Sequence, residues 1–199
     1  MVKQNKKTYT IWKLEYPEIL KGGEKGEDEL SDLARDLTKE LRDVDRREIL
    51  AFTDDVGREV RESIEWSYEL QYATTKDGRI IAVWGVQPKH TADWLGRHAL
   101  IWCLGTDLIK RYAVSFAKES KAILEEWAWK YGPLCNMVGS FNEDAIRWLR
   151  WVGADFILSA DFIQRGGLPA VVMQGGEDFF PFVIRPKHPR HPKDSKGGK

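Results

Sequence analysis

The chain has 199 residues, of which 42% are hydrophobic and 12% aromatic. This composition supports a packed core of ordinary domain size and excludes a wholly disordered chain. Lysine and arginine number 31, as do aspartate and glutamate, so the net charge alone predicts no polyanionic partner. The charges are unevenly placed, because residues 1–13 and 185–199 are basic and the segment 24–62 is acidic.

Neither a membrane segment nor a disulfide framework is predicted. No apolar run reaches the about 18 residues that span a bilayer, and the N-terminus lacks the apolar stretch of a secretory signal. The two cysteines, Cys103 and Cys135, lie in apolar surroundings. We therefore expect two reduced core thiols in a cytosolic compartment.

The N-terminal part is predicted to form an arm followed by three helices. In the arm, residues 1–29, an apolar patch around Trp12 either adds a strand or anchors a partner. The expected helix starts are Ser31 as a cap, Asp45 with Glu48 as a capping box, and the pair Asp54 and Asp55.

The middle of the chain changes to a period of two. Tyr68, Leu70 and Tyr72 alternate with polar residues, which predicts a half-buried strand. Asp77-Gly78 indicates a hairpin turn before an apolar run over 80–86, which is typical of a central strand. A loop over 88–94 and a buried strand over 99–104 are expected next.

The C-terminal part alternates helices and strands. Apolar residues recur at helical spacing over 109–131 until Gly132-Pro133, which predicts one long helix. Next come a strand over 134–138, a helix from Asn142 to Gly153, and strands over 155–160 and 183–184. The order predicts an α/β (α+β) fold with helices flanking one mixed sheet.

Tryptophans are expected on both buried and exposed faces. The buried set is Trp84 and Trp102 in strands, with Trp66, Trp127 and Trp148 on helices. Trp129 and Trp151 fall off the apolar faces, so they either contact another subunit or pack against a neighbouring element.

This order of elements resembles the GNAT acetyltransferase fold. The run NEDAIRWLRWVGA, from Asn142 to Ala154, is similar to the Asn…Ala…aromatic-Tyr…Gly-Phe helix and turn of that superfamily. The resemblance implies a GNAT-like mixed sheet, in which an antiparallel hairpin precedes a strand and a long helix. It also implies that the sheet splays between that strand and the next, parallel one.

A narrower resemblance covers residues 33–160. Its pieces are 41–49, 77–86, 102–106 and 146–153. Their order and spacing are similar to those of the acetyltransferase-like internal virion protein family of short-tailed bacteriophages. The resemblance implies a role in the virion or in its assembly in the host cytoplasm, with other phage structural proteins or a second copy of the chain as partners.

Three parts of the chain are expected. They are an N-terminal arm over 1–29, a GNAT-like domain over 30–184 and a disordered basic tail over 185–199. Spaced prolines exclude a helix in the tail. The tail is expected either to contact DNA nonspecifically or to act as a solubilising end.

The predicted acetyl-CoA site is incomplete. In the GNAT fold, a glycine-rich turn before the long helix offers main-chain N–H groups to the cofactor pyrophosphate. The matching residues 104–111 contain one glycine, and Asp107 would cap the helix there and repel a phosphate; a residual phosphate cradle is the alternative. Gly105, Thr106 and Asn142 are cofactor-binding candidates only if acetyl-CoA binding is retained.

The catalytic groups of the superfamily are also incomplete. Leu149 stands where the resemblance places a Tyr acid, and Ala154 replaces the aromatic residue after the glycine. Candidates for a general base are Glu65, Glu69 and His98, each equally typical of a surface charge or a satisfied core residue. The histidines and cysteines show no zinc spacing, so no metal site is predicted.

These features favour a phage virion or assembly protein with a degenerate acetyl-CoA site, no assigned catalytic residue and no cofactor. The alternative is an active N-acetyltransferase that uses acetyl-CoA to modify a protein amine.

Overall fold

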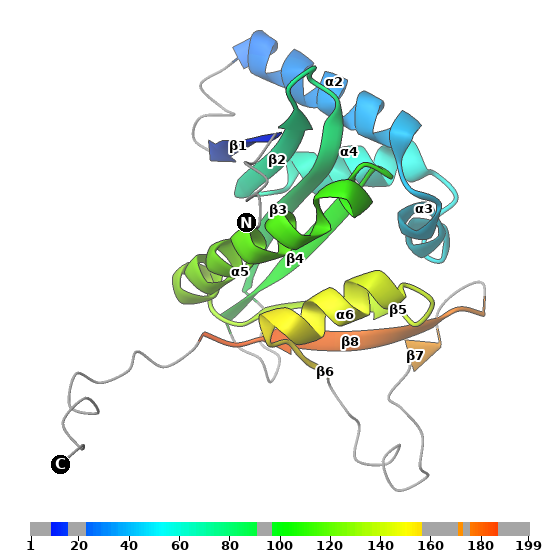
Figure 1. Ribbon diagram of the computed structural model, residues 1–199, viewed down its shortest axis with the longest axis vertical. Helices are drawn as coiled ribbons and strands as arrows, with labels where there is room; N and C mark the ends of the chain where they lie inside the picture. Colours follow the sequence, from blue (N-terminus) through cyan, green and yellow to red (C-terminus); the bar gives the residue numbers. More distant parts are fainter. Residues whose placement is uncertain (1–8, 16–22, 91–96, 157–170, 173–175, 187–199) are drawn as a thin grey trace, which may run out of the picture.

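The computed structural model describes residues 9–15, 23–90, 97–156, 171–172 and 176–186. These residues form an eight-stranded mixed sheet with helices on both faces (Figure 1). The strand order is β1-β2-β3-β4-β5-β8-β6, with β7 paired to β8. The predicted α/β sandwich around one mixed sheet is therefore confirmed.

The first half of the sheet is an antiparallel meander preceded by helices. Its elements are β1 (Tyr9–Glu15), α2 (Gly23–Glu40), α3 (Asp43–Leu50), α4 (Val56–Glu65), β2 (Glu69–Thr75), β3 (Ile80–His90) and β4 (Arg97–Gly105). Asp55 caps α4 by accepting a hydrogen bond from the Arg58 N–H, as its position predicts. Gly78 takes a φ of 83° in the tight turn between β2 and β3, a conformation that favours glycine.

The second half contains the crossover helices. Its elements are α5 (Ile109–Tyr131), β5 (Leu134–Gly139), α6 (Glu143–Val152), β6 (Asp155–Phe156), β7 (Val171–Val172) and β8 (Asp178–Ile184). The bounds of α5 match the prediction. Gly132 ends this helix at a φ of 91°, and Gly153 ends α6 at 92°.

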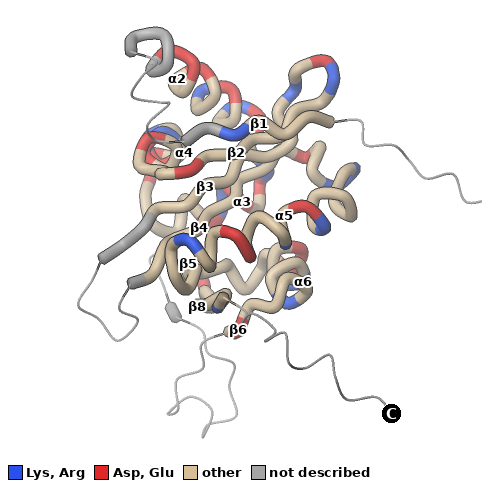
Figure 2. Tube along the Cα trace, turned by 90° about the vertical axis from the view of Figure 1, so that its left-hand side faces the viewer, with Lys and Arg blue, Asp and Glu red and all other residues tan. Residues whose placement is uncertain are grey.

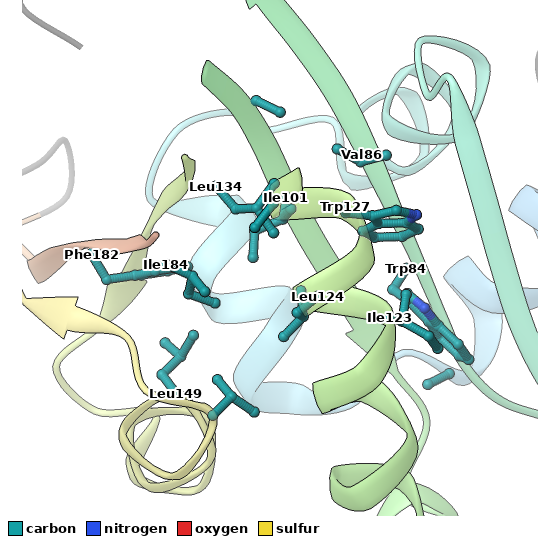
Figure 3. Close-up of a cluster of buried hydrophobic side chains, with 14 of the residues drawn as sticks. Trp84, Val86, Ile101, Ile123, Leu124, Trp127, Leu134, Leu149, Phe182 and Ile184 are labelled. Atoms are coloured by element: carbon teal, nitrogen blue, oxygen red, sulfur yellow. The ribbon is translucent and has the colours of Figure 1, made fainter. Parts of the chain in front are cut away.

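Two apolar clusters lie on opposite faces of the sheet. On one face α5 and α6 pack against the strands, and Figure 3 shows Trp84, Trp127 and Leu149 in this cluster. On the other face α2 and α4 cover the sheet around Leu37, Val60 and Leu70. Figure 2 shows the strands following one another from β1 at the top to β6 at the bottom. No helix in the described parts of the chain is long and apolar enough to cross a membrane.

Several element boundaries differ from the predictions. The patch around Trp12 is strand β1, paired antiparallel with β2. Helix α2 begins at Gly23, so Ser31 lies inside it and does not cap it. Strand β3 continues through Pro88 to His90, where a loop is predicted. The division into arm, domain and tail stays a prediction, and the residues 187–199 of the tail lie outside the described part.

The tryptophan predictions are confirmed in part. Trp84 and Trp127 are buried, whereas Trp129 and Trp151 are exposed. The prediction that Trp66 is buried is wrong, because Trp66 follows α4 as its C-terminal cap residue and is 58% exposed. Trp102 and Trp148 are half-buried. The Trp102 indole N–H donates to the Ser67 hydroxyl at 2.9 Å.

Candidate functional site

The sheet opens between β4 and β5. These parallel strands pair only at Ala99–Leu134 and Leu100–Cys135, and then diverge. A cleft of about 900 Å³ lies beyond the last pair, between the two strands and helices α5 and α6. Its walls are mostly apolar and include Ile101, Phe116, Met137, Val138, Trp148 and Leu149.

Asn136 joins the two strands just where they diverge. Its amide nitrogen donates to the Ile101 carbonyl of β4 at 2.6 Å, and its amide oxygen accepts from the Met137 N–H of β5 at 2.7 Å. One side chain therefore satisfies a main-chain group on each side of the opening. A ligand that lay between the strands would have to displace it.

Asp45 of α3 accepts a hydrogen bond from the main chain where β4 ends. The Gly105 N–H donates to Asp45 Oδ2 at 2.7 Å, and the Gly105 carbonyl accepts from the Arg42 N–H at 3.0 Å. A Cβ atom on Gly105 would lie 3.4 Å from Arg42 Nε, so the glycine leaves room for this approach of α3. The Thr106 N–H is also used, because it donates to the Ile81 carbonyl at 3.0 Å.

The Asp45 carboxylate is buried with a cation beside it. Arg42 Nε donates to Asp45 Oδ2 at 2.9 Å, and its Nη2 donates to Oδ1. Asp45 is 1% exposed. Burial raises the pKa of this carboxyl, against the opposing effects of the Arg42 guanidinium and the Gly105 N–H. A partner cation and a main-chain donor together make this buried carboxylate tolerable in the fold.

In the turn from β4 into α5, main-chain groups are hydrogen-bonded by Thr106 and not by Asp107. The Thr106 hydroxyl donates to the Ile80 carbonyl at 2.8 Å and accepts from the Leu108 N–H at 3.3 Å. Asp107 is exposed and pairs with Lys110 at 2.8 Å, and the α5 N-cap, Leu108, makes no side-chain cap bond. The predicted cap by Asp107 is therefore wrong, and the acid at this turn is Asp45.

Glu48, one helical turn after Asp45, makes the equivalent contact on β5. Its Oε1 accepts from the Gly139 N–H at 2.8 Å and from Asn142 Nδ2 at 3.0 Å. Burial raises the pKa of this carboxyl from 4.5 to about 7, although the Gly139 and Asn142 donors oppose the shift. Glu48 also lines the cleft, so the carboxyl with this raised pKa forms part of the cleft wall.

Asn142 has the structural role that its sequence position predicts. Its Oδ1 accepts from the Ala145 N–H at 3.2 Å and so caps α6. Its Nδ2 is the donor to Glu48, so both ends of the amide are engaged within the chain. Leu149 is buried on the inner face of α6 and lines the cleft.

Cys103 lines the same cleft on β4. Burial, together with the Asp45 and Glu48 carboxylates, raises the pKa of its thiol to about 12, and the Arg42 guanidinium only partly offsets this. Such a thiol is protonated and unreactive at neutral pH. Cys103 and Cys135 are both free thiols, as expected.

None of the three predicted general bases lies in the cleft. Glu69 is buried on β2 and accepts hydrogen bonds from Trp127 Nε1 at 2.8 Å, Lys130 Nζ at 2.5 Å and Tyr131 OH at 2.6 Å. Glu65 is exposed at the end of α4, and His98 is buried on β4 next to β3. Neither of the latter two lines the cleft.

The residues that fill the site were not predicted from the sequence. The sequence predicts no role for Arg42 or Asn136, and the spacing of Asp45 and Glu48 predicts a capping box. The same spacing of three places both carboxylates on one face of α3, which is the signal that indicates their shared role. Within the described residues, no group of three or more metal-ligating side chains could hold a metal ion.

Comparisons with known proteins identify the fold. No protein-family model and no curated protein sequence matches the chain. Three solved structures are similar to it. The ribosomal-protein-S5-alanine acetyltransferase from Vibrio fischeri has a TM-score of 0.55 and 10% identity, and the match covers 94% of this chain and 98% of that one. An acetyltransferase of the GNAT family from Streptococcus pneumoniae has a TM-score of 0.51 and 11% identity, and the match covers 88% of this chain and 98% of that one. The structure of yncA from Salmonella typhimurium with its cofactor acetyl-CoA has a TM-score of 0.56 and 9% identity, and the match covers 94% of this chain and 98% of that one.

At these low identities the likeness is one of fold. The hairpin β2–β3, the splay between β4 and β5, and the long crossover helix α5 are the parts that the sequence resemblance implies. The chain has a GNAT-like fold.

Proposed function

We propose that this protein is a bacteriophage virion or assembly protein that uses a GNAT-like scaffold for contacts and does not transfer acetyl groups. The phage assignment is supported by the sequence resemblance over residues 33–160. Other phage structural proteins or a second copy of the chain are the proposed partners. The proposed location is the virion, with the host cytoplasm as the place of assembly.

The contact between Asp45 and Gly105 carries the proposal that acetyl-CoA is not bound. A pyrophosphate at this turn needs free main-chain N–H groups and a positive local field. Here the Gly105 N–H already donates to a buried carboxylate, and the Thr106 N–H donates to Ile81. A phosphate would have to break the first contact and lie beside a negative charge, so the residues present do not fit the cofactor.

The remaining cofactor candidates support the same conclusion. Asn142 is engaged as the cap of α6 and as the donor to Glu48. Leu149, at the position of the superfamily's acid, has no proton to give to a leaving thiolate. Binding and proton transfer are thus both compromised at the positions where the resemblance places them.

Titration with acetyl-CoA tests the loss of cofactor binding. We expect no binding heat by calorimetry and no shift in Tm at about 1 mM acetyl-CoA. A site with a Kd of about 10 μM would stabilise the protein by about 2.7 kcal/mol under those conditions, which is easily measured. A saturable heat with a matching Tm shift would contradict the proposal.

Fractionation of phage particles tests the assembly role. We expect the protein to co-purify with virions or with assembly intermediates, at a fixed ratio to a known structural protein. Its absence from both fractions, in an infection that produces the protein, would contradict this role.

A second candidate function is N-acetylation of a protein amine with acetyl-CoA. The observation that favours it is the cleft of about 900 Å³, which remains open between the diverging strands. In this candidate Gly105, Thr106 and Asn142 would contact the cofactor after Asp45 had moved. The titration separates the two candidates, since only the enzyme requires binding.

A further inference from the structure

Helix α3 makes contacts on both sides of the opening in the sheet. Asp45 reaches the last residue of β4, and Glu48 reaches the last residue of β5. Figure 1 shows α3 at the end where the two strands have diverged. Two carboxylates one helical turn apart therefore connect two strands that no longer pair with each other.

Further contacts tie α3 to the β5 and β8 side. The Arg47 guanidinium lies 3.8 Å from the centre of the Phe141 ring, and it pairs with Glu177 at 2.8 Å. Phe52, just after the helix, packs edge-on against Phe179 of β8. The position of α3 is thus fixed against both halves of the sheet and not only against the helix layer of α2 and α4.

We propose that α3 is a latch, in which Asp45 on Gly105 and Glu48 on Gly139 hold the ends of β4 and β5 at a fixed spacing and so set the width of the cleft that Cys103 lines. This inference goes beyond the proposed function, because it describes how the two strands are held at their opening, whichever macromolecule the protein contacts.

The two halves of the latch differ in strength. Asp45 is paired with the Arg42 guanidinium, whereas Glu48 accepts from two neutral donors, a main-chain N–H and an amide. Hydrogen bonds to an ionised carboxylate are stronger than those to its neutral form. Glu48 is therefore the half that releases first.

Charged groups around Glu48 set when that release happens. Burial raises the pKa of Glu48 to about 7; among its charged neighbours, Asp45 raises the pKa and Arg42 lowers it. The thiol of Cys103, on the facing strand, is protonated throughout this range. The latched state holds the Glu48 proton more tightly than a solvated carboxyl with a pKa of 4.5 does, so protonation of Glu48 strengthens the latch as the pH falls through 7.

A pair of substitutions at one residue tests the latch. Glu48→Ala removes the acceptor for the Gly139 N–H, while Glu48→Gln removes the charge but keeps an acceptor oxygen. Asp43→Asn, an exposed acid on the same helix, is the matched control. The readout is the rate at which iodoacetamide modifies Cys103, measured by mass spectrometry against buried Cys135 as an internal reference.

We expect Glu48→Ala to raise the ratio of Cys103 to Cys135 modification at least about tenfold, with Glu48→Gln and Asp43→Asn close to the wild type. An unchanged ratio in Glu48→Ala would overturn the latch. Equal acceleration in Ala and Gln would also overturn it, because the effect would then come from the lost charge.

A second measurement uses the unaltered chain and so does not depend on a variant that folds. Amide hydrogen exchange, corrected for intrinsic rates, is compared at pH 8 and pH 6. We expect the protection of Gly139 to rise severalfold at pH 6 while that of Gly105 stays constant. Constant protection of both amides, a parallel change in both, or a fall at Gly139 would contradict the proposal.

Discussion

Glu48 shows how one buried side chain makes folding sensitive to pH. The native carboxyl has a pKa of about 7, raised from 4.5 by burial, so the native state holds a proton that the unfolded state has lost. Between these two values the free energy of unfolding therefore falls as the pH rises. Above pH 7 both states are ionised and this contribution no longer changes.

The first prediction compares Glu48→Gln with the wild type by urea unfolding from pH 4.5 to 8. The variant has no group to titrate here, so the difference in unfolding free energy, wild type minus variant, should fall by about 3 kcal/mol up to pH 7. A difference that stays constant with pH would show that Glu48 has an ordinary pKa.

Residue-level roles were the hardest part to predict from the sequence. Asp45 and Glu48 do satisfy main-chain N–H groups, which is what a capping box predicts, but the partners are Gly105 and Gly139. These contacts span 60 and 91 residues. Local spacing cannot distinguish a carboxylate that caps its own helix from one that reaches a distant strand.

At the scale of elements, α5 is anchored at its C-terminal end by Glu69. Burial raises the pKa of Glu69, but the hydrogen bonds from Lys130, Tyr131 and Trp127 outweigh this and hold it below its usual value. The carboxylate therefore remains charged at neutral pH. Its role is structural, since it connects the last two turns of α5 to β2.

The second prediction concerns this anchor. Glu69→Ala should lower the free energy of unfolding by about 2–3 kcal/mol, because it leaves buried Trp127 and Tyr131 donors without their acceptor. Chemical unfolding measures the change, and Glu65→Ala, at an exposed position of α4, is the control and should change it by less than about 0.5 kcal/mol. Equal effects of the two substitutions would refute the anchor.

Elements with a strong local signal were predicted well. The apolar period and the Gly132-Pro133 stop fix α5, and Asn142 with Gly153 fixes α6. The start of α2 was missed because Gly23 and Gly26 favour a loop, although the helix forms through them. The predicted β3 ends too early because a proline argues against a strand. In the structure Pro88 pairs with Ala99 of β4.

At the scale of the whole molecule, the sheet consists of two halves that are joined by only two residue pairs between β4 and β5. The order of elements predicted the mixed sheet and the resemblance implied its splay, but neither indicated that β8 pairs with β5 over residues 134–139. The segment before β8 carries turn residues and no periodic pattern, so the sequence gives no indication of where the last strand inserts.

The third prediction tests this join through Asn136, which bridges Ile101 and Met137. Asn136→Ala should lower the opening free energy of β5 and β8 amides by about 1 kcal/mol in native-state hydrogen exchange. Amides of β2 and β3 serve as the internal control and should be less affected. A uniform loss over all strands would show that the sheet opens as one unit.

The two residue pairs that join β4 to β5 also have a mechanical consequence. Tension applied between β1 and β8 is carried across β2, β3, β4 and β5, and every interface on this path other than β4–β5 shares the load among at least six pairs of residues. The β4–β5 interface divides the same load between two pairs, Ala99–Leu134 and Leu100–Cys135. Under force the molecule is expected to part along this line first, leaving the meander β1–β4 as one body.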